Sequence, residues 1–256
     1  MAPAAHPFNI SAPLAALLSA IPVSPPMALK QIAAAGFRDV QIDGRQPGMR
    51  PRELDRSARR GLAADLRRLE LRPAGIDMWI PPEHFLDSAR VDHAVHALLA
   101  TIDLAGELGR MPVSLALPRP ETTDDSWQDV LTTIRDACER CGAVLADHAL
   151  PLRDTDADET IGAGIDPAAL LASGEDPCAA VHARPERVTS ARLSDLYGTG
   201  MRGPIGAQDG RLDWRGYQVA LSVARYNRPV VVDSRQWPEP WAGCRQTLAL
   251  WTGGGA

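Results

Sequence analysis

The sequence lacks an excess of basic residues, and it lacks long apolar runs. Its 27 Lys and Arg residues face 32 Asp and Glu residues, which gives a net charge of -5. We expect no nucleic-acid partner, because binding to a phosphate backbone needs a basic face. We expect no membrane span either, since no apolar run approaches the roughly 20 residues that one needs. No Lys or Arg precedes the apolar N-terminal stretch, so it makes a poor secretory signal, and we expect a cytoplasmic protein.

Cysteines are few, and the four present do not form a recognisable disulfide or zinc framework. Cys138 and Cys141 make the only CxxC, and it closes a helical pattern just before Gly142. A redox CxxC belongs at a helix N-terminus, where the helix dipole lowers a thiol pKa. A zinc site would need a second pair at suitable spacing. We therefore predict structural thiols.

Hairpin signals such as Asn-Gly are absent between the strand-like segments, and no GxGxxG follows the first of them. Short β-branched or apolar runs instead alternate with helical patterns, which is typical of parallel strands with crossover helices. The helical patterns occupy 27–37, 56–71, 91–109, 126–142 and 214–227. The predicted strand segments are 8–11, 39–43, 72–80, 111–118, 143–149, 161–166, 189–196 and 229–235.

Eight such units in 256 residues match the size of a closed (β/α)₈ TIM barrel of the α/β class. No Gly- or Ser-rich linker divides the chain, so we expect a single domain over 1–256. The segment 150–162 is acidic and polar, which predicts a barrel without a helix between strands five and six. An open doubly wound sheet is the alternative, although its dinucleotide-binding fingerprint is missing.

A TIM barrel carries its site at the C-terminal ends of its strands, and the predicted strand ends here are polar. Strand three runs out into a segment that offers Trp79 and His84. Asp166 also suits the N-cap of a following helix that begins with a proline. The remaining candidates at strand ends are Asp147, His148, Arg192, Asp195, Asp233 and Arg235.

Four segments resemble the xylose isomerase-like TIM-barrel superfamily, which includes sugar phosphate isomerases and epimerases, ketose epimerases and endonuclease IV. They are "ALKQIAAAGFRDVQID", "TIDLAGELGRMPVSLALP", "IGAGIDPAALLASGEDP" and "GAQDGRLDWRGYQVALSVARYNRPVVVD". The resemblance covers nearly the whole chain. It implies a small sugar-like substrate and one divalent cation (Mn, Mg or Co), held by residues after strands five to eight.

Carried over by motif, the metal positions fall on Asp147, Asp166, Arg192 and Asp233. Arg192 stands where the resemblance implies a histidine ligand, and both expected glutamates are aspartates. Ala169 replaces a second histidine common after strand six. A guanidinium cannot coordinate a cation. We therefore expect either a metal on Asp147, Asp166 and Asp233, or no metal and Arg192 paired with these carboxylates in its place.

Two functions follow. The first is a sugar isomerase or epimerase that acts on a small sugar, polyol or sugar acid by proton transfer at the barrel mouth. Asp147 and Asp233 would then be catalytic, and the substrate-binding residues would be Trp79, His84, His148, Arg192, Asp195 and Arg235. The alternative is a catalytically inactive relative that binds a small ligand or serves as a partner subunit. DNA repair in the manner of endonuclease IV is disfavoured by the acidic charge and by a total of six histidines.

Two further groups of residues have ordinary interpretations. His93 and His96 are three residues apart on a helical pattern, and we predict surface or packing histidines remote from the barrel mouth. Trp237, Trp241 and Trp251 lie close together near the C-terminus. We predict that these tryptophans pack the last helix against the barrel, with a homodimer interface as the alternative.

Overall fold

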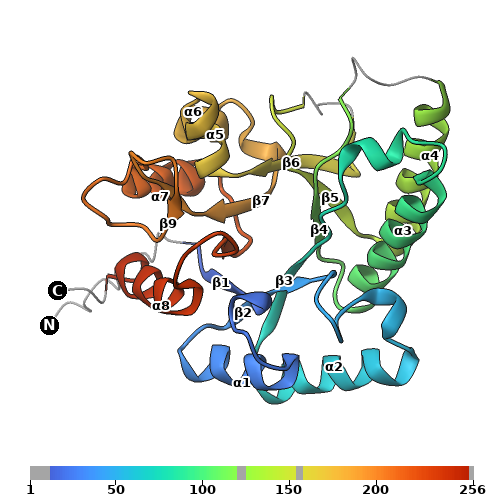
Figure 1. Cartoon of the computed structure of the whole chain (residues 1–256), viewed down its shortest axis with the longest axis horizontal. Coiled ribbons are helices and arrows are strands. Elements are labelled where there is room, and N and C mark those ends of the chain that lie inside the picture. Colours follow the sequence, from blue (N-terminus) through green and yellow to red (C-terminus); the bar gives the residue numbers. More distant parts are fainter. Residues whose placement is uncertain (1–11, 120–124, 154–157, 254–256) are drawn as a thin grey trace, which may run out of the picture.

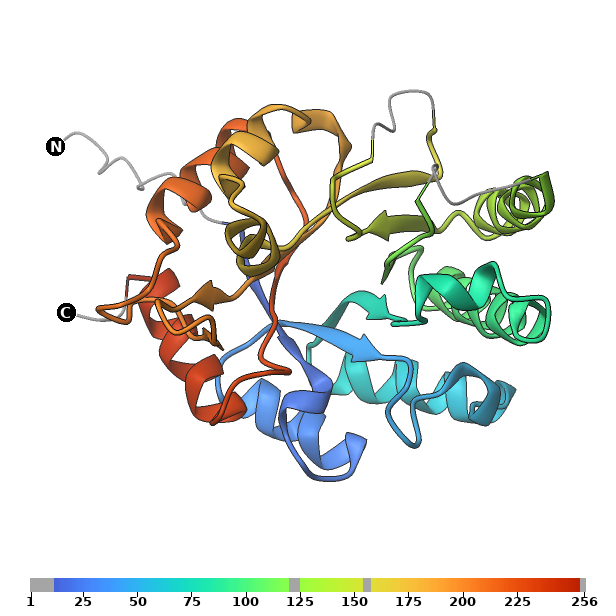
Figure 2. The same ribbon diagram turned by 45° about the horizontal axis from the view of Figure 1, so that its top comes forward.

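The computed structural model describes residues 12–119, 125–153 and 158–253, and its parallel strands close into an eight-stranded barrel (Figures 1 and 2). Around the ring the order is β1, β10, β7, β6, β5, β4, β3 and β2. The predicted (β/α)₈ barrel is confirmed, and the open-sheet alternative is wrong. The strands of the ring are β1 (Leu14–Leu17), β2 (Asp39–Asp43), β3 (Arg72–Asp77), β4 (Pro112–Leu115), β5 (Val144–Asp147), β6 (Ile161–Ile165), β7 (Val188–Leu193) and β10 (Val230–Val232).

Seven of these strands overlap the segments predicted from the sequence. The eighth predicted segment, 8–11, lies outside the described residues, and β1 is formed a few positions later by Leu14–Leu17. Every residue of β1 is buried. A strand of the barrel is buried on both faces, by the helices outside and by the side chains of the barrel interior. Its sequence is therefore a continuous apolar run and does not alternate between apolar and polar residues.

Helices form an outer layer around the strands (Figure 2). In the described residues between β5 and β6, which omit 154–157, there is no helix, as expected, whereas two short helices lie between β6 and β7. No helix of the described chain has the length and apolarity needed to cross a lipid bilayer. The helices are α1 (Pro25–Ala34), α2 (Arg56–Arg68), α3 (Val91–Glu107), α4 (Asp125–Cys141), α5 (Pro167–Ser173), α6 (Pro177–His182), α7 (Trp214–Val223) and α8 (Pro240–Trp251).

A small antiparallel pair interrupts the alternation after β7. Its strands are β8 (Asp195–Leu196) and β9 (Arg202–Gly203), with Asp195 opposite Gly203. No Asn-Gly turn marks this hairpin in the sequence, and of its two strands only β8 falls within the predicted strand segment 189–196. The hairpin matters because it returns the chain to the C-terminal end of the barrel at Arg202.

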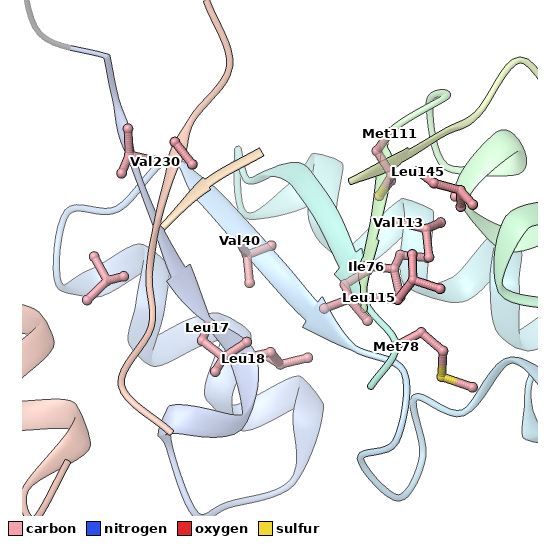
Figure 3. Packing of buried hydrophobic residues seen from close by; sticks show 14 of the residues in the cluster. Leu17, Leu18, Val40, Ile76, Met78, Met111, Val113, Leu115, Leu145 and Val230 are labelled. Carbon is pink, nitrogen blue, oxygen red and sulfur yellow. The ribbon is translucent and has the colours of Figure 1, made fainter. Parts of the chain in front are cut away.

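The apolar core lies mainly between the strands and the helices, where Leu17, Val40, Ile76 and Leu145 pack with their neighbours (Figure 3). The small residues Ala15, Ala74 and Val231 form a separate buried apolar cluster. Val231 pairs in register with Arg192 of β7. Small side chains in this second cluster leave room for long polar ones nearby.

The C-terminal tryptophans pack as predicted. The Trp237 indole donates a hydrogen bond to Ser194 Oγ at 2.9 Å, and the Trp251 indole donates to the Ala12 carbonyl at 2.8 Å. Trp241 lies 6.2 Å from the ring of Phe37, centroid to centroid. These contacts fix α8 and the last loop on the barrel.

Structural thiols are also supported. Cys138 is buried, and burial raises the pKa of its thiol to about 12, so the thiol stays protonated. Cys141 donates a hydrogen bond to Asp103 Oδ1 at 3.2 Å. Neither cysteine has the lowered pKa that redox chemistry needs.

The core predicts a clear stability difference between two helix substitutions. Leu98 on α3 is completely buried, whereas Val219 on α7 is 56% exposed. We expect Leu98→Ala to lower the free energy of unfolding by about 2–5 kcal/mol, because it leaves a cavity. Val219→Ala should change it by less than about 0.5 kcal/mol. Urea denaturation measures both, and equal effects would contradict the packing described.

Candidate functional site

The side chain of Arg192 lies buried at the centre of a group of carboxylates. Its Nη2 is 2.6 Å from Asp77 Oδ1, and its Nη1 is 3.1 Å from Asp233 Oδ2 and 3.9 Å from Asp166 Oδ2. Only 4% of this side chain is exposed. The carboxylates come from the ends of β3, β6 and β10, so the closure of the ring brings them together.

Two further arginines complete the group. Arg235 binds Asp233 in a fork, with Nε 2.8 Å from Oδ1 and Nη2 2.6 Å from Oδ2, and its Nη1 also contacts Asp77. Arg202 of β9 donates from Nη1 to both oxygens of Asp166, at 3.1 and 3.0 Å. We call the six residues the arginine–aspartate cluster: Asp77, Asp166, Arg192, Arg202, Asp233 and Arg235.

The formal charges of the cluster cancel, with three guanidinium groups facing three carboxylates. Arg192, Arg235 and Arg202 hold the pKa of Asp233 below its usual range, in spite of burial. Burial raises the pKa of Asp77, and the charges of Arg192 and Arg235 oppose that rise. Removing one partner of such a buried group would leave an uncompensated charge, which is strongly destabilising.

Asp166 has two roles. As predicted, it is the N-cap of α5, where its Oδ1 accepts a hydrogen bond from the Ala169 amide at 3.1 Å. The same carboxylate is paired with Arg202. The helix cap therefore fixes the orientation of a cluster carboxylate, and Ala169 contributes its backbone amide rather than a side chain.

Asp147 does not join the contacts of Arg192, which corrects the expectation that the two would be paired. Its Oδ2 is 3.1 Å from Arg153 Nε, and its Oδ1 accepts from the amides of Leu117 and Ala149 at 3.0 Å each. Arg153 comes from the segment after β5, which takes the place of the missing helix. The carboxylate of Asp147 is thus committed to a separate ion pair and to the backbone.

Asp195 likewise lies outside the cluster. It is buried, and its Oδ1 accepts hydrogen bonds from the amides of Leu196, Arg211 and Leu212 at 2.8–2.9 Å. These bonds hold the chain after β7 against the segment that leads into α7. A role in organising this loop accounts for its burial better than the predicted contact with substrate.

His148 is buried beside the cluster with only 6% of its surface exposed. Neither ring nitrogen has a hydrogen-bond partner among the described residues. The ring lies against the backbone of Gly164, where a Cβ would be 2.5 Å from it. Burial, followed by the charges of Arg192 and Arg235, holds the pKa of His148 well below its ordinary value, so the imidazole is neutral.

Trp79 and His84 line a different space from the cluster. They border a cavity of about 720 Å³ together with Met78, Arg45 and the first turns of α3, and no cluster residue lines it. His93 and His96 line the same cavity. Both side chains are exposed and lie apart from the arginine–aspartate cluster, as predicted for surface histidines. The sequence did not indicate that they line a cavity.

Three residues of the site were missed in the sequence. Asp77 ends β3 and could have been found by the rule that selected the other strand ends. Neither Arg202 nor Arg153 stands directly at the end of a strand of the ring, because Arg202 lies on the hairpin and Arg153 lies further along the loop after β5. Only the folded chain brings them to the carboxylates.

The donor set does not fit a divalent cation. The two cluster carboxylates expected as ligands, Asp166 and Asp233, are both ion-paired to arginines, and Arg192 lies between them. Within the described ranges, no group of three or more His, Cys, Asp or Glu side chains has an arrangement that could hold a metal ion. Three guanidinium groups would also repel a cation at this position.

Comparison with solved structures supports the fold. The chain is similar to an L-ribulose 3-epimerase (TM-score 0.74, 16% identity, covering 95% of this chain and 94% of that one). It is similar to a D-tagatose 3-epimerase-like protein (TM-score 0.73, 13% identity, 95% and 100% covered). A xylose isomerase domain protein from Planctomyces limnophilus gives a TM-score of 0.71 at 15% identity, with 95% and 96% covered.

No protein-family model and no curated protein matches the sequence. The solved structures nevertheless show that the chain has the fold of the xylose isomerase-like TIM barrels, so the resemblance seen in the sequence is confirmed for the fold. Sugar isomerases and epimerases are prominent among the proteins that share this fold.

The neutral state of His148 predicts a specific pH dependence of stability. In the unfolded chain a histidine binds a proton near pH 6.5, whereas the folded His148 does not. Acidification therefore favours the unfolded state, and each pH unit below about 6.5 should lower the free energy of unfolding by up to about 1.4 kcal/mol.

Urea denaturation between pH 5 and 7.5 measures this slope. His148→Gln should flatten it, while His182→Gln, at an exposed position on α6, should leave it as in the wild type. The same slope in all three proteins would show that His148 is not held neutral.

Proposed function

We propose that the protein binds a small sugar, polyol or sugar acid at the mouth of its barrel without a divalent metal, as a metal-independent relative of the sugar isomerases and epimerases that share its fold. The position of Arg192 supports this most strongly, because its guanidinium lies 2.6–3.9 Å from three carboxylates. Two of the three, Asp166 and Asp233, are the carboxylates that the resemblance assigns to a metal.

Unused hydrogen-bonding capacity beside the cluster suits a polyhydroxylated ligand. Arg202 uses only Nη1 in its contacts with the described residues, so its Nε and Nη2 remain donors, and 19% of its side chain is exposed. Neutral His148 has one donor and one acceptor without a partner among the described residues, both of them buried. A hydroxyl group is both donor and acceptor, and a carboxylate would accept from Arg202.

Binding is favoured over turnover by the state of the two predicted catalytic carboxylates. Asp233 is bound by Arg192 and Arg235, which keep its pKa below the usual range, and Asp147 is bound by Arg153. A general base works best when its pKa lies near the working pH, so an ion-paired Asp233 is a weak one. Catalytic roles for Asp147 and Asp233 remain predictions.

One observation favours proton transfer as a second candidate function. His148 is neutral, and neither of its ring nitrogens is bonded to a described residue, so one nitrogen has no competing partner for a substrate proton. Its lowered pKa makes it a weak base, as it does for Asp233. The adjacent guanidinium groups would stabilise the negative charge that develops on a sugar oxygen when a proton leaves the neighbouring carbon. Such a reaction would be an isomerisation or epimerisation without metal.

A ligand screen with metal removed tests the proposal. Elemental analysis of the purified protein should find Mn, Mg and Co substoichiometric. In the presence of EDTA, at least one compound from a panel of polyols, aldoses and aldonates should raise Tm. At about 100 times Kd the stabilisation is about 2.7 kcal/mol, or roughly 5–10 °C in Tm for a chain of this size.

Arg202→Gln should abolish most of this shift. The matched control is Arg38→Gln, because Arg38 is exposed and precedes β2 at the opposite end of the barrel. This variant should retain the Tm shift. A stoichiometric metal whose removal eliminates ligand binding would overturn the proposal. So would the absence of a response to every member of the panel.

A further inference from the structure

The cavity of about 720 Å³ beside Trp79 lies between η2 (Pro51–Glu53), the segment after β3 and the N-terminal half of α3. Its volume is within the range of small-ligand sites, about 300–1,000 Å³. No residue of the arginine–aspartate cluster lines it, so it is distinct from the site of the proposed function.

The walls of this cavity are largely apolar and include one exposed aromatic ring. The buried side chains of Met78 and Ile80 form one wall. The opposite wall is formed by α3, where Ala94 and Ala97 have small side chains that leave the cavity open. Trp79 is 38% exposed, although its neighbours on both sides are buried. An indole held in this way offers a flat surface on which another aromatic ring can stack.

Positive charge dominates the rim. Arg45, Arg50 and Arg52 line the cavity, and Asp92 is the one carboxylate among the lining residues. Arg50 is paired with Glu53 at 2.9 Å, and Arg45 is 3.7 Å from Asp43. Arg52 makes no ion pair within the described part of the chain, so its charge remains available to a ligand.

The histidines of the cavity supply hydrogen bonds rather than a metal site. His84 Nε2 accepts from Arg90 Nη1 at 2.8 Å, which commits one nitrogen of that ring. His93 and His96 are exposed and line the cavity with Asp92, but these groups have no metal-binding arrangement within the described ranges.

We propose that this cavity binds a small aromatic carboxylate, with the aromatic ring stacked on Trp79 and the carboxylate directed toward Arg52. The apolar wall would contact the aromatic ring of the ligand, and the excess positive charge of the rim arginines would attract its carboxylate. The proposal is independent of what binds at the arginine–aspartate cluster.

Isothermal titration with 2-naphthoate tests this, with 2-naphthamide as the uncharged probe of the same shape. We expect one molecule of 2-naphthoate to bind per chain, and the amide to bind about threefold more weakly, as the loss of one exposed ion pair implies. Trp79→Ala should weaken naphthoate binding about tenfold by removing the stacking surface. Arg52→Gln should weaken it about threefold.

Arg67→Gln, at an exposed position on α2 outside the cavity, is the charge-matched control and should bind naphthoate like the wild type. Trp79→Ala alters an exposed side chain, so loss of folding does not obscure the result. The proposal is overturned if 2-naphthoate does not bind at millimolar concentration, or if it binds equally well to Trp79→Ala. Equal affinity for the amide, or no effect of Arg52→Gln, would overturn the assignment of an anionic ligand.

Discussion

Burial of the Arg192 charge is the constraint on which the site depends. A guanidinium stays protonated at any ordinary pH, so a side chain that is 4% exposed must be matched by carboxylates close to it. Asp77, Asp166 and Asp233 supply them from three different strand ends. Only a closed ring of parallel strands places these ends around one point, and the small residues Ala15 and Ala74 among the strands leave space for the long side chain.

This pairing changes the kind of chemistry that the barrel mouth can support. Carboxylates that would suit a hard cation are instead engaged by arginines, and in the proposed function the ligand is recognised by the hydrogen-bonding groups left over. His148 and Arg202 are those groups, one neutral and buried, the other charged and partly exposed. The similarity to sugar epimerases, at 16% identity or less, extends to the fold.

Much of the fold could be predicted from the sequence, because apolar runs, helical periods and the absence of hairpin signals are local properties. The rule that barrel sites lie at strand ends found Arg192, Asp166 and Asp233. It could not find Arg202 or Arg153, since these reach the carboxylates from a hairpin and a loop whose paths no local pattern specifies.

The same limit explains why the sequence predicts the wrong partner for Asp147 and does not indicate the cavity beside Trp79. Which arginine an aspartate pairs with depends on differences of about 1 Å in the positions of side chains from different strands. Strand order places such residues on one rim, but it does not say which of them touch. Helix α3 begins on the C-terminal side of β3, and this places His93 in the wall of the cavity beside Trp79.

A double-mutant cycle between Arg192 and Asp77 tests the central claim most directly. Arg192→Leu, Asp77→Asn and the double variant would be compared with the wild type by urea denaturation at pH 7. A contact of 2.6 Å between buried charges predicts a coupling free energy of about 1.5–3 kcal/mol. Additive effects, with a coupling below about 0.5 kcal/mol, would contradict the account.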